Sequence, residues 1–228
     1  RLADQREIAK DNQTAKDQLL KQTKNQEVNY KKLLADSVAR KAAFEKELFE
    51  LESQLRIFID LSKLPAPGRG VLKWPLQNVY VTQQFGKTVD AKRLYVSGTH
   101  NGIDLRAGIG TLVFSAAAGE VKGVGDTDLV CRGVSYGKWV LLEHANGLST
   151  IYAHLSLIKA APGQVIASGE VIGYSGQTGY STGPHLHLSV VATQGVRIDD
   201  YNFRSCDGAK ITMPLADPDA YLDPLLYL

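Results

Sequence analysis

The sequence at residues 182–188 is Thr182-Gly183-Pro184-His185-Leu186-His187-Leu188, an apolar stretch that holds two of the five histidines of the chain. Side chains alternate between the two faces of a β-strand, so we expect His185 and His187 to project from one face of a sheet. The stretch therefore predicts a strand that carries two imidazoles side by side.

A second segment with side chains that can bind a metal lies upstream, at His100-Asn101-Gly102-Ile103-Asp104. His100 and Asp104 can share a face in either a strand or a helical turn. A catalytic zinc site needs three ligands of imidazole or carboxylate type and a fourth position left open for water. The two segments together point to metal-dependent hydrolysis.

Glycine and proline are distributed unevenly along the 228 residues. Residues 1–64 contain neither, and all 21 Gly and all 8 Pro lie beyond Leu64. Such a change in composition predicts a continuous helix followed by a turn-rich domain. We expect a helical arm over residues 1–64, a linker over 65–76 and a β domain over 77–228.

The arm carries apolar residues at alternating spacings of four and three, at Phe44, Leu48, Leu51, Leu55 and Phe58. This heptad pattern predicts a coiled-coil segment, whose seam needs an apolar partner. A second chain, another helix and the domain's own surface all remain open as that partner. The arm itself is either a spacer or dimerisation coil, or a regulatory element that docks on a partner.

The remainder of the chain is rich in short strand signals. Asn146-Gly147 separates the strand-like runs 139–144 and 148–154, and Asn-Gly is a strong hairpin signal because both residues tolerate positive φ. No helical period of useful length follows. We therefore expect a mainly antiparallel β domain, in which His144 is structural.

Charge and cysteine content narrow the class of protein. The formal net charge of +2 provides no basic excess for a nucleic-acid partner. The two cysteines, Cys131 and Cys206, are either free thiols or a disulfide. A disulfide closing so long a loop would stabilise the fold by roughly 4 kcal/mol and would place the protein outside the cytoplasm.

An ordered set of motifs carries a family resemblance over residues 81–222. The set comprises Gln84-Phe85-Gly86, His100-Asn101-Gly102-Ile103-Asp104-Leu105, Gly110-Thr111-Leu112-Val113, Ala118-Gly119-Glu120-Val121, Tyr152-Ala153-His154-Leu155-Ser156 and Thr178-Gly179-Tyr180-Ser181-Thr182-Gly183-Pro184-His185-Leu186-His187. It resembles the lysostaphin-type, or LytM-like, zinc endopeptidases of bacterial cell walls. Residues 195–213 interrupt the shorter family pattern as an insertion.

The resemblance implies a role for each motif residue. His100, Asp104 and His187 match the zinc ligands, and His154 and His185 match two unliganded histidines beside the metal. Zinc lowers the pKa of bound water from about 15.7 to about 7 and polarises the scissile carbonyl. One histidine would take or orient the proton of that water and the other would stabilise the oxyanion, in an order that the sequence leaves open.

The implied function is that of a zinc metalloendopeptidase which hydrolyses peptide cross-links or stems of bacterial peptidoglycan. It would act extracytoplasmically, in the periplasm, at the cell surface or after secretion. Through its coiled coil the arm would serve regulation or docking to a membrane-borne envelope or division complex. The alternative is a non-enzymatic regulator that activates a separate cell-wall hydrolase. Such regulators typically lack some metal ligands, whereas all five motif residues are present here.

Overall fold

Helix α1 (Leu2–Glu52) opens the chain in the computed structural model, which describes residues 2–55 and 59–228, with side chains at 13, 14, 16–55, 59, 60 and 62–228. The chain divides into two compact units, residues 1–40 and residues 41–228. The described part of the first unit is entirely helical. No helix among the described residues has both the length and the apolarity needed to cross a bilayer.

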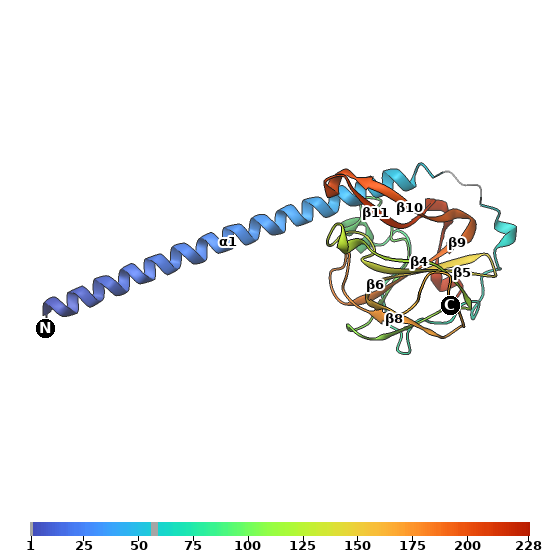
Figure 1. Ribbon diagram of the computed structural model, residues 1–228, viewed down its shortest axis with the longest axis horizontal. Helices are drawn as coiled ribbons and strands as arrows, with labels where there is room; N and C mark the ends of the chain where they lie inside the picture. The colour runs from blue at the N-terminus through green and yellow to red at the C-terminus, as the bar shows by residue number, and fades with distance from the viewer. Residues whose placement is uncertain (1, 56–58) are drawn as a thin grey trace. The chain divides into compact units, whose positions relative to one another are not determined.

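The second unit is built on an antiparallel sheet (Figure 1). Its described strands are β1 (Val81–Gln83), β2 (Ile103–Arg106), β3 (Leu112–Phe114), β4 (Gly119–Asp126), β5 (Lys138–His144), β6 (Leu148–Ile158), β7 (Val165–Ile166), β8 (Val171–Ser175), β9 (His185–Ala192) and β12 (Tyr221–Leu222). The order is β1-β2-β9-β6-β5-β4-β7, with β12 paired to β9 and with β8 paired to β3 and β6. The predicted fold class, mainly antiparallel β preceded by a long helix, is confirmed.

A separate two-stranded hairpin joins β10 (Val196–Phe203) to β11 (Ala209–Ala216). It occupies most of the segment that the sequence marked as an insertion. One further α-helix, α2 (Val89–Leu94), lies between β1 and β2. Short 3-10 turns cover Leu61–Lys63, Thr127–Leu129, Thr193–Gly195, Arg204–Cys206, Pro218–Ala220 and Pro224–Leu226.

The Asn146-Gly147 turn connects β5 to β6, as the sequence predicted. Gly147 has φ of 83°, and a Cβ there would lie 2.7 Å from the carbonyl oxygen of Lys63. Glycine meets both requirements, because it adopts positive φ without strain and leaves room for the neighbouring backbone.

The alternation of side chains along the strands builds a core on each side of the main sheet. On β6, Tyr152 belongs to one buried cluster and Ile151 to the other. The first cluster also takes Leu72 and Leu76, which come from the stretch 65–76 that the sequence assigned to a linker. The second cluster lies between the sheet, the β10–β11 hairpin and the end of α1.

The end of α1 supplies the seam residues to that second cluster. Phe44 and Leu55 are buried, and Leu48 and Leu51 pack against the cluster in part. Phe58 lies outside the described residues. For residues 44–55 the apolar partner is therefore the domain's own surface, and a coiled coil formed by the arm stays a prediction.

The two cysteines form a disulfide, with Cα atoms 5.8 Å apart and a sequence separation of 75. Cys206 lies in the 3-10 turn that closes the β10–β11 hairpin, and Cys131 follows the turn after β4. The bond thus pins the tip of the hairpin to the rest of the domain.

Candidate active site and metal centre

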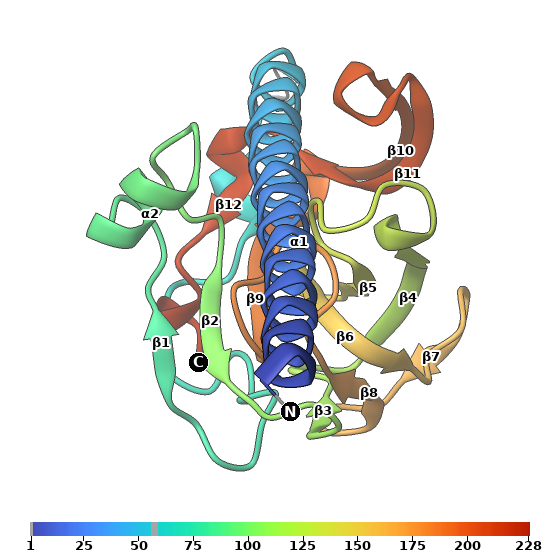
Figure 2. The same cartoon turned by 90° about the vertical axis from the view of Figure 1, so that its left-hand side faces the viewer.

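The predicted metal ligands meet where β2 lies beside β9 (Figure 2). Asp104 on β2 is directly opposite His187 on β9, so both side chains project from the same face of the sheet. His100 precedes β2 and is positioned by a bridge to Gly86. Among the described residues, His100, Asp104 and His187 form a group whose ligand atoms all lie within 4.8 Å of one another.

A glycine makes this close approach possible. Gly102 lies between the two ligands of the upstream segment, and a Cβ on it would be 2.7 Å from Nε2 of His187 and 2.4 Å from the carbonyl oxygen of Leu188. Any larger residue at 102 would push β9 away. The Gly in the segment His100–Asp104 is thus part of the site's construction.

The three side chains are buried and directed at one another. Oδ1 of Asp104 lies 2.9 Å from Nδ1 of His187 and 3.2 Å from Nε2 of His100. Burial acts to raise the pKa of Asp104, but the hydrogen bonds from the two imidazoles outweigh it and hold that pKa well below its usual range. The carboxylate is therefore ionised and ready to act as a ligand.

The other ring nitrogens of the two histidines are held from outside. Nδ1 of His100 lies 3.0 Å from the carbonyl oxygen of Gln84, and Nε2 of His187 lies 2.8 Å from Oγ of Ser189. Such outer contacts orient ligating imidazoles and leave the opposite nitrogen for a metal. One carboxylate oxygen and two imidazole nitrogens form a donor set that suits a borderline divalent ion such as zinc.

The two predicted catalytic histidines lie beside these ligands. The ring centroids of His154 and His185 are 4.6 Å apart, and that of His154 is 5.8 Å from that of His187. Nδ1 of His154 is 2.8 Å from the carbonyl oxygen of Thr178, and Nδ1 of His185 is 2.8 Å from that of Gly183. Nε2 of His154 is thereby left for a substrate or water, whereas Nε2 of His185 lies 3.6 Å from Oδ1 of Asp104.

His154 reaches this position through an unusual backbone conformation. Ala153 is opposite His187, so a regular strand would turn His154 to the other face of the sheet. Instead His154 has φ of 61°, in the left-handed region, and the register of β6 shifts just beyond it. This local strain, of order 1–3 kcal/mol for a non-glycine residue, brings its ring to the predicted metal ligands.

Burial also sets the protonation state of His154. It lowers the pKa of this imidazole to about 3, and the neighbouring His185 adds to the effect. Burial likewise lowers the pKa of His187, against the opposing attraction of Asp104. The ring of His154 is thus neutral near pH 7, the form that can accept a proton.

The site also contains two tyrosines that were not predicted from the sequence. The ring of Tyr95 stacks on His100 with centroids 5.6 Å apart and planes 2° apart. The hydroxyl of Tyr136 accepts a hydrogen bond of 3.2 Å from the side-chain amide of Asn101. In the sequence, the glycine directly after Tyr136 could have drawn attention to this position. Gly137 has φ of 60°, and a Cβ there would lie 2.4 Å from the backbone nitrogen of Gly179.

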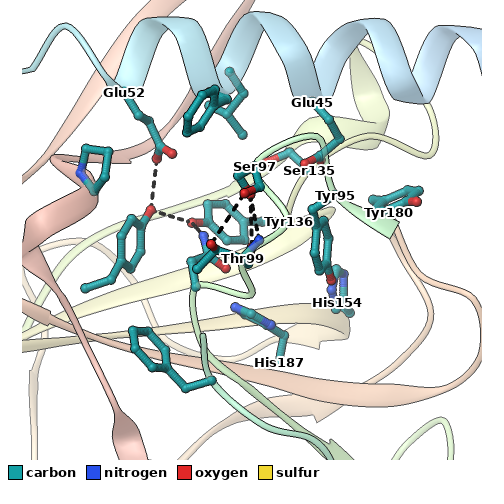
Figure 3. Close-up of a pocket in the computed structure, with 16 residues that line it drawn as sticks. Glu45, Glu52, Tyr95, Ser97, Thr99, Ser135, Tyr136, His154, Tyr180 and His187 are labelled. Atoms are coloured by element: carbon teal, nitrogen blue, oxygen red, sulfur yellow. Dashed lines mark hydrogen bonds between the residues drawn. The ribbon is translucent and has the colours of Figure 1, made fainter. Parts of the chain in front are cut away.

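A cavity of about 180 Å³ lies over His154 and His187 (Figure 3). One wall is formed by the domain, including Tyr95, Tyr136 and Tyr180, and the other by Glu45, Leu48, Phe49 and Glu52 of α1. The remaining histidine, His144, takes part in a different network, with Nε2 2.8 Å from Oγ1 of Thr150 and Nδ1 2.9 Å from the carbonyl oxygen of Ala118.

Residues 98–200, which include the five predicted site residues, match the model of Peptidase family M23. This segment is similar to the peptidase domains of that family. The predicted resemblance and the predicted enzyme class, a metallopeptidase, are thereby confirmed. The family implies a metal, and His100, Asp104 and His187 form a site in this chain that could hold it.

Two curated relatives are similar over part of the chain. The DD-carboxypeptidase/endopeptidase Mpg of Neisseria meningitidis serogroup B is 42% identical over 113 residues, which are 50% of this chain and 24% of the relative. The peptidoglycan DD-endopeptidase ShyA of Vibrio cholerae serotype O1 is 40% identical over 93 residues, which are 40% of this chain and 20% of the relative. The chain thus spans a quarter or less of the length of these relatives.

Among solved structures, the catalytic domain of the antimicrobial peptidase lysostaphin from Staphylococcus simulans is 25% identical to this chain. The match covers 65% of this chain and 90% of that domain, with a TM-score of 0.46.

Proposed function

We propose that this chain is a zinc-dependent endopeptidase that hydrolyses peptide cross-links or stems of bacterial peptidoglycan. The observation that carries the proposal is the convergence of His100, Asp104 and His187 beside two further histidines, each held through Nδ1 by a backbone carbonyl. Support for the substrate comes from the two relatives, one named a DD-carboxypeptidase/endopeptidase and the other a peptidoglycan DD-endopeptidase. An extracytoplasmic location fits the same substrate and the disulfide.

In this proposal the chain's own residues bind, orient and transfer protons around the scissile peptide bond. Zinc held by His100, Asp104 and His187 would supply an acidified water and a polarised carbonyl. Nε2 of His154 or of His185 accepts the proton of the attacking water and returns it to the leaving amine. The other ring, when it carries a proton on Nε2 as well as on Nδ1, donates a hydrogen bond from Nε2 to the carbonyl oxygen as negative charge develops on it.

The division of the chain into an arm (1–64), a linker (65–76) and a peptidase domain (77–228) belongs to the same proposal. The arm would regulate the domain or connect it to a membrane-borne envelope or division complex. The contact between residues 44–55 and the second core supports a regulatory part for the end of α1.

Digestion of purified peptidoglycan tests the proposal. The full chain should release soluble fragments with new peptide termini, which mass spectrometry identifies, and a chelator should stop their release. Asp104→Ala should release none, whereas Asp90→Ala, a matched change at an exposed acid of α2, should behave as the original chain. Equal release by Asp104→Ala, or no release by the original chain under any metal condition, would refute the assignment.

A further inference from the structure

The last turns of α1 lie over the cavity that contains the catalytic histidines. Glu45, Leu48, Phe49 and Glu52 form its outer wall, and His154 and His187 lie at its inner end. In Figure 3 the side chains of Glu45 and Glu52 descend from the helix towards the ring of tyrosines around these histidines. A peptide approaching the metal ligands from this side would meet the helix first.

An aromatic contact holds this segment on the domain. Phe44 is fully buried, and its ring stacks on Phe203 of β10 with centroids 4.2 Å apart and planes 30° apart. Phe203 is also fully buried. The helix therefore docks on the hairpin β10–β11, so the arm and the insertion, the two parts outside the shorter family pattern, contact each other.

Hydrogen bonds to Glu47 supplement the apolar contact between the helix and the hairpin. The carboxylate of Glu47 accepts hydrogen bonds from the backbone N–H of Arg204 at 2.9 Å and of Ser205 at 2.9 Å. It also accepts from Nε of Arg204 at 3.1 Å and from Oγ of Ser205 at 2.7 Å. Burial acts to raise the pKa of Glu47, but these bonds outweigh it and lower the pKa to about 2. The Glu47 carboxylate thus binds the turn 204–206, and the disulfide at Cys206 fixes the position of that turn.

Further along the helix, Glu52 connects the segment to the floor of the site. Its Oε1 accepts a hydrogen bond of 2.9 Å from the hydroxyl of Tyr221, which is 3.2 Å from the hydroxyl of Tyr136. Tyr136 in turn accepts from Asn101, the neighbour of His100. A chain of hydrogen bonds therefore runs from α1 to the segment that supplies two of the metal ligands.

The two carboxylates over the cavity oppose permanent docking. Burial raises the pKa of Glu45 to about 7, with the charge of Glu52 adding to the effect, and burial raises that of Glu52 to about 7 although Tyr221 and the amide of Ala216 donate to it. The titratable groups that face these carboxylates across the cavity are Tyr95, Tyr136, Tyr180, Tyr221 and Asp217. Ionising either carboxylate in this setting disfavours the docked state.

We propose that residues 44–52 are an internal plug of the peptidase groove, and that Glu47 with the turn 204–206 is the latch that retains it. A substrate peptide enters after the latch opens and the helix leaves the cavity. The identity of that substrate rests on the proposed function, whereas the docking and release of the helix do not.

Two variants of the full chain separate the latch from a general effect of charge on the helix. Glu47→Ala removes the latch carboxylate. Glu50→Ala removes an exposed carboxylate of the same helix, whose described ion pair is with Lys46 at 3.8 Å and which acts on Arg204 only through space. We expect amide hydrogen exchange at residues 44–52 to be at least about tenfold faster in Glu47→Ala, equivalent to about 1.4 kcal/mol, and unchanged in Glu50→Ala.

Access to the groove is read from two further measurements on the same proteins. Acylation of His154 by an imidazole-directed reagent, located by peptide mass mapping, and release of fragments from purified peptidoglycan should both be faster in Glu47→Ala. Unchanged exchange in Glu47→Ala would overturn the latch. Faster exchange with unchanged acylation and hydrolysis would overturn the plug. Faster exchange and acylation without hydrolysis by any variant would support the plug and refute the proposed function instead.

Discussion

Replacing Phe44 with Ala should release residues 44–52 from the groove while the main sheet stays folded. Phe44 is fully buried against Phe203. Burial of an aromatic side chain removes roughly 150–250 Å² from water, which at about 25 cal/mol per Å² is worth about 4–6 kcal/mol as an upper bound. Since alanine keeps its Cβ, we expect a loss of about 3–4 kcal/mol in docking free energy, within the range of buried Phe→Ala changes.

Amide hydrogen exchange measures this loss locally. A change of about 3 kcal/mol corresponds to a fall of roughly 150-fold in the protection of residues 44–52. Protection of the central strands β6 and β9 should stay the same. Phe44→Leu keeps most of the apolar contact and loses only the aromatic pairing, so it should cost about 1 kcal/mol.

Two results would refute this reasoning. Unchanged protection of residues 44–52 in Phe44→Ala would mean that the ring contributes nothing to docking. An equal loss of protection in β6 and β9 would mean that the helix end and the sheet open together, so the segment would be part of the core and unable to leave it as a plug.

Four more predictions concern the site, the disulfide and pH. Asp104→Ala should abolish zinc binding, measured by elemental analysis, because it removes one of three proposed ligands. His154→Ala should keep its zinc and lose about 10²–10⁴ in hydrolysis rate, measured on purified peptidoglycan. Replacing both disulfide cysteines with Ser should lower the free energy of unfolding by roughly 4 kcal/mol, measured in urea. Docking of residues 44–52 should be strongest near pH 5, measured by hydrogen-exchange protection factors corrected for intrinsic exchange. The pKa of Glu47 is lowered to about 2, so its contribution to docking is lost as pH falls below about 4.5. The pKa of Glu52 is raised to about 7, so its contribution is lost as pH rises towards 7.

Sequence patterns were sufficient to predict those features that a few neighbouring residues determine. The period of two along 185–188 predicted that His185 and His187 share a face, and the structure has both on β9 directed towards Asp104. The Asn146-Gly147 turn and the long Gly- and Pro-free helix were equally readable. In each case a few neighbouring residues determine the conformation.

Other features depend on contacts between distant parts of the chain. The pairing of Asp104 with His187 joins residues 83 apart in sequence, and no local pattern sets that register. The left-handed conformation of His154 is imposed by its surroundings, because a histidine in a strand pattern predicts ordinary alternation. The heptad seam predicted an apolar partner for Phe44 but could not select Phe203, since that ring is brought into place by the hairpin and its disulfide.

The most direct test of the zinc peptidase is a titration of metal-free protein. Zinc is added in small steps while the bound metal and the release of peptidoglycan fragments are measured in parallel. We expect activity to rise in proportion to bound zinc and to saturate at about one ion per chain, as for a site with three protein ligands. Hydrolysis by the metal-free protein, or full zinc binding without any hydrolysis, would contradict it.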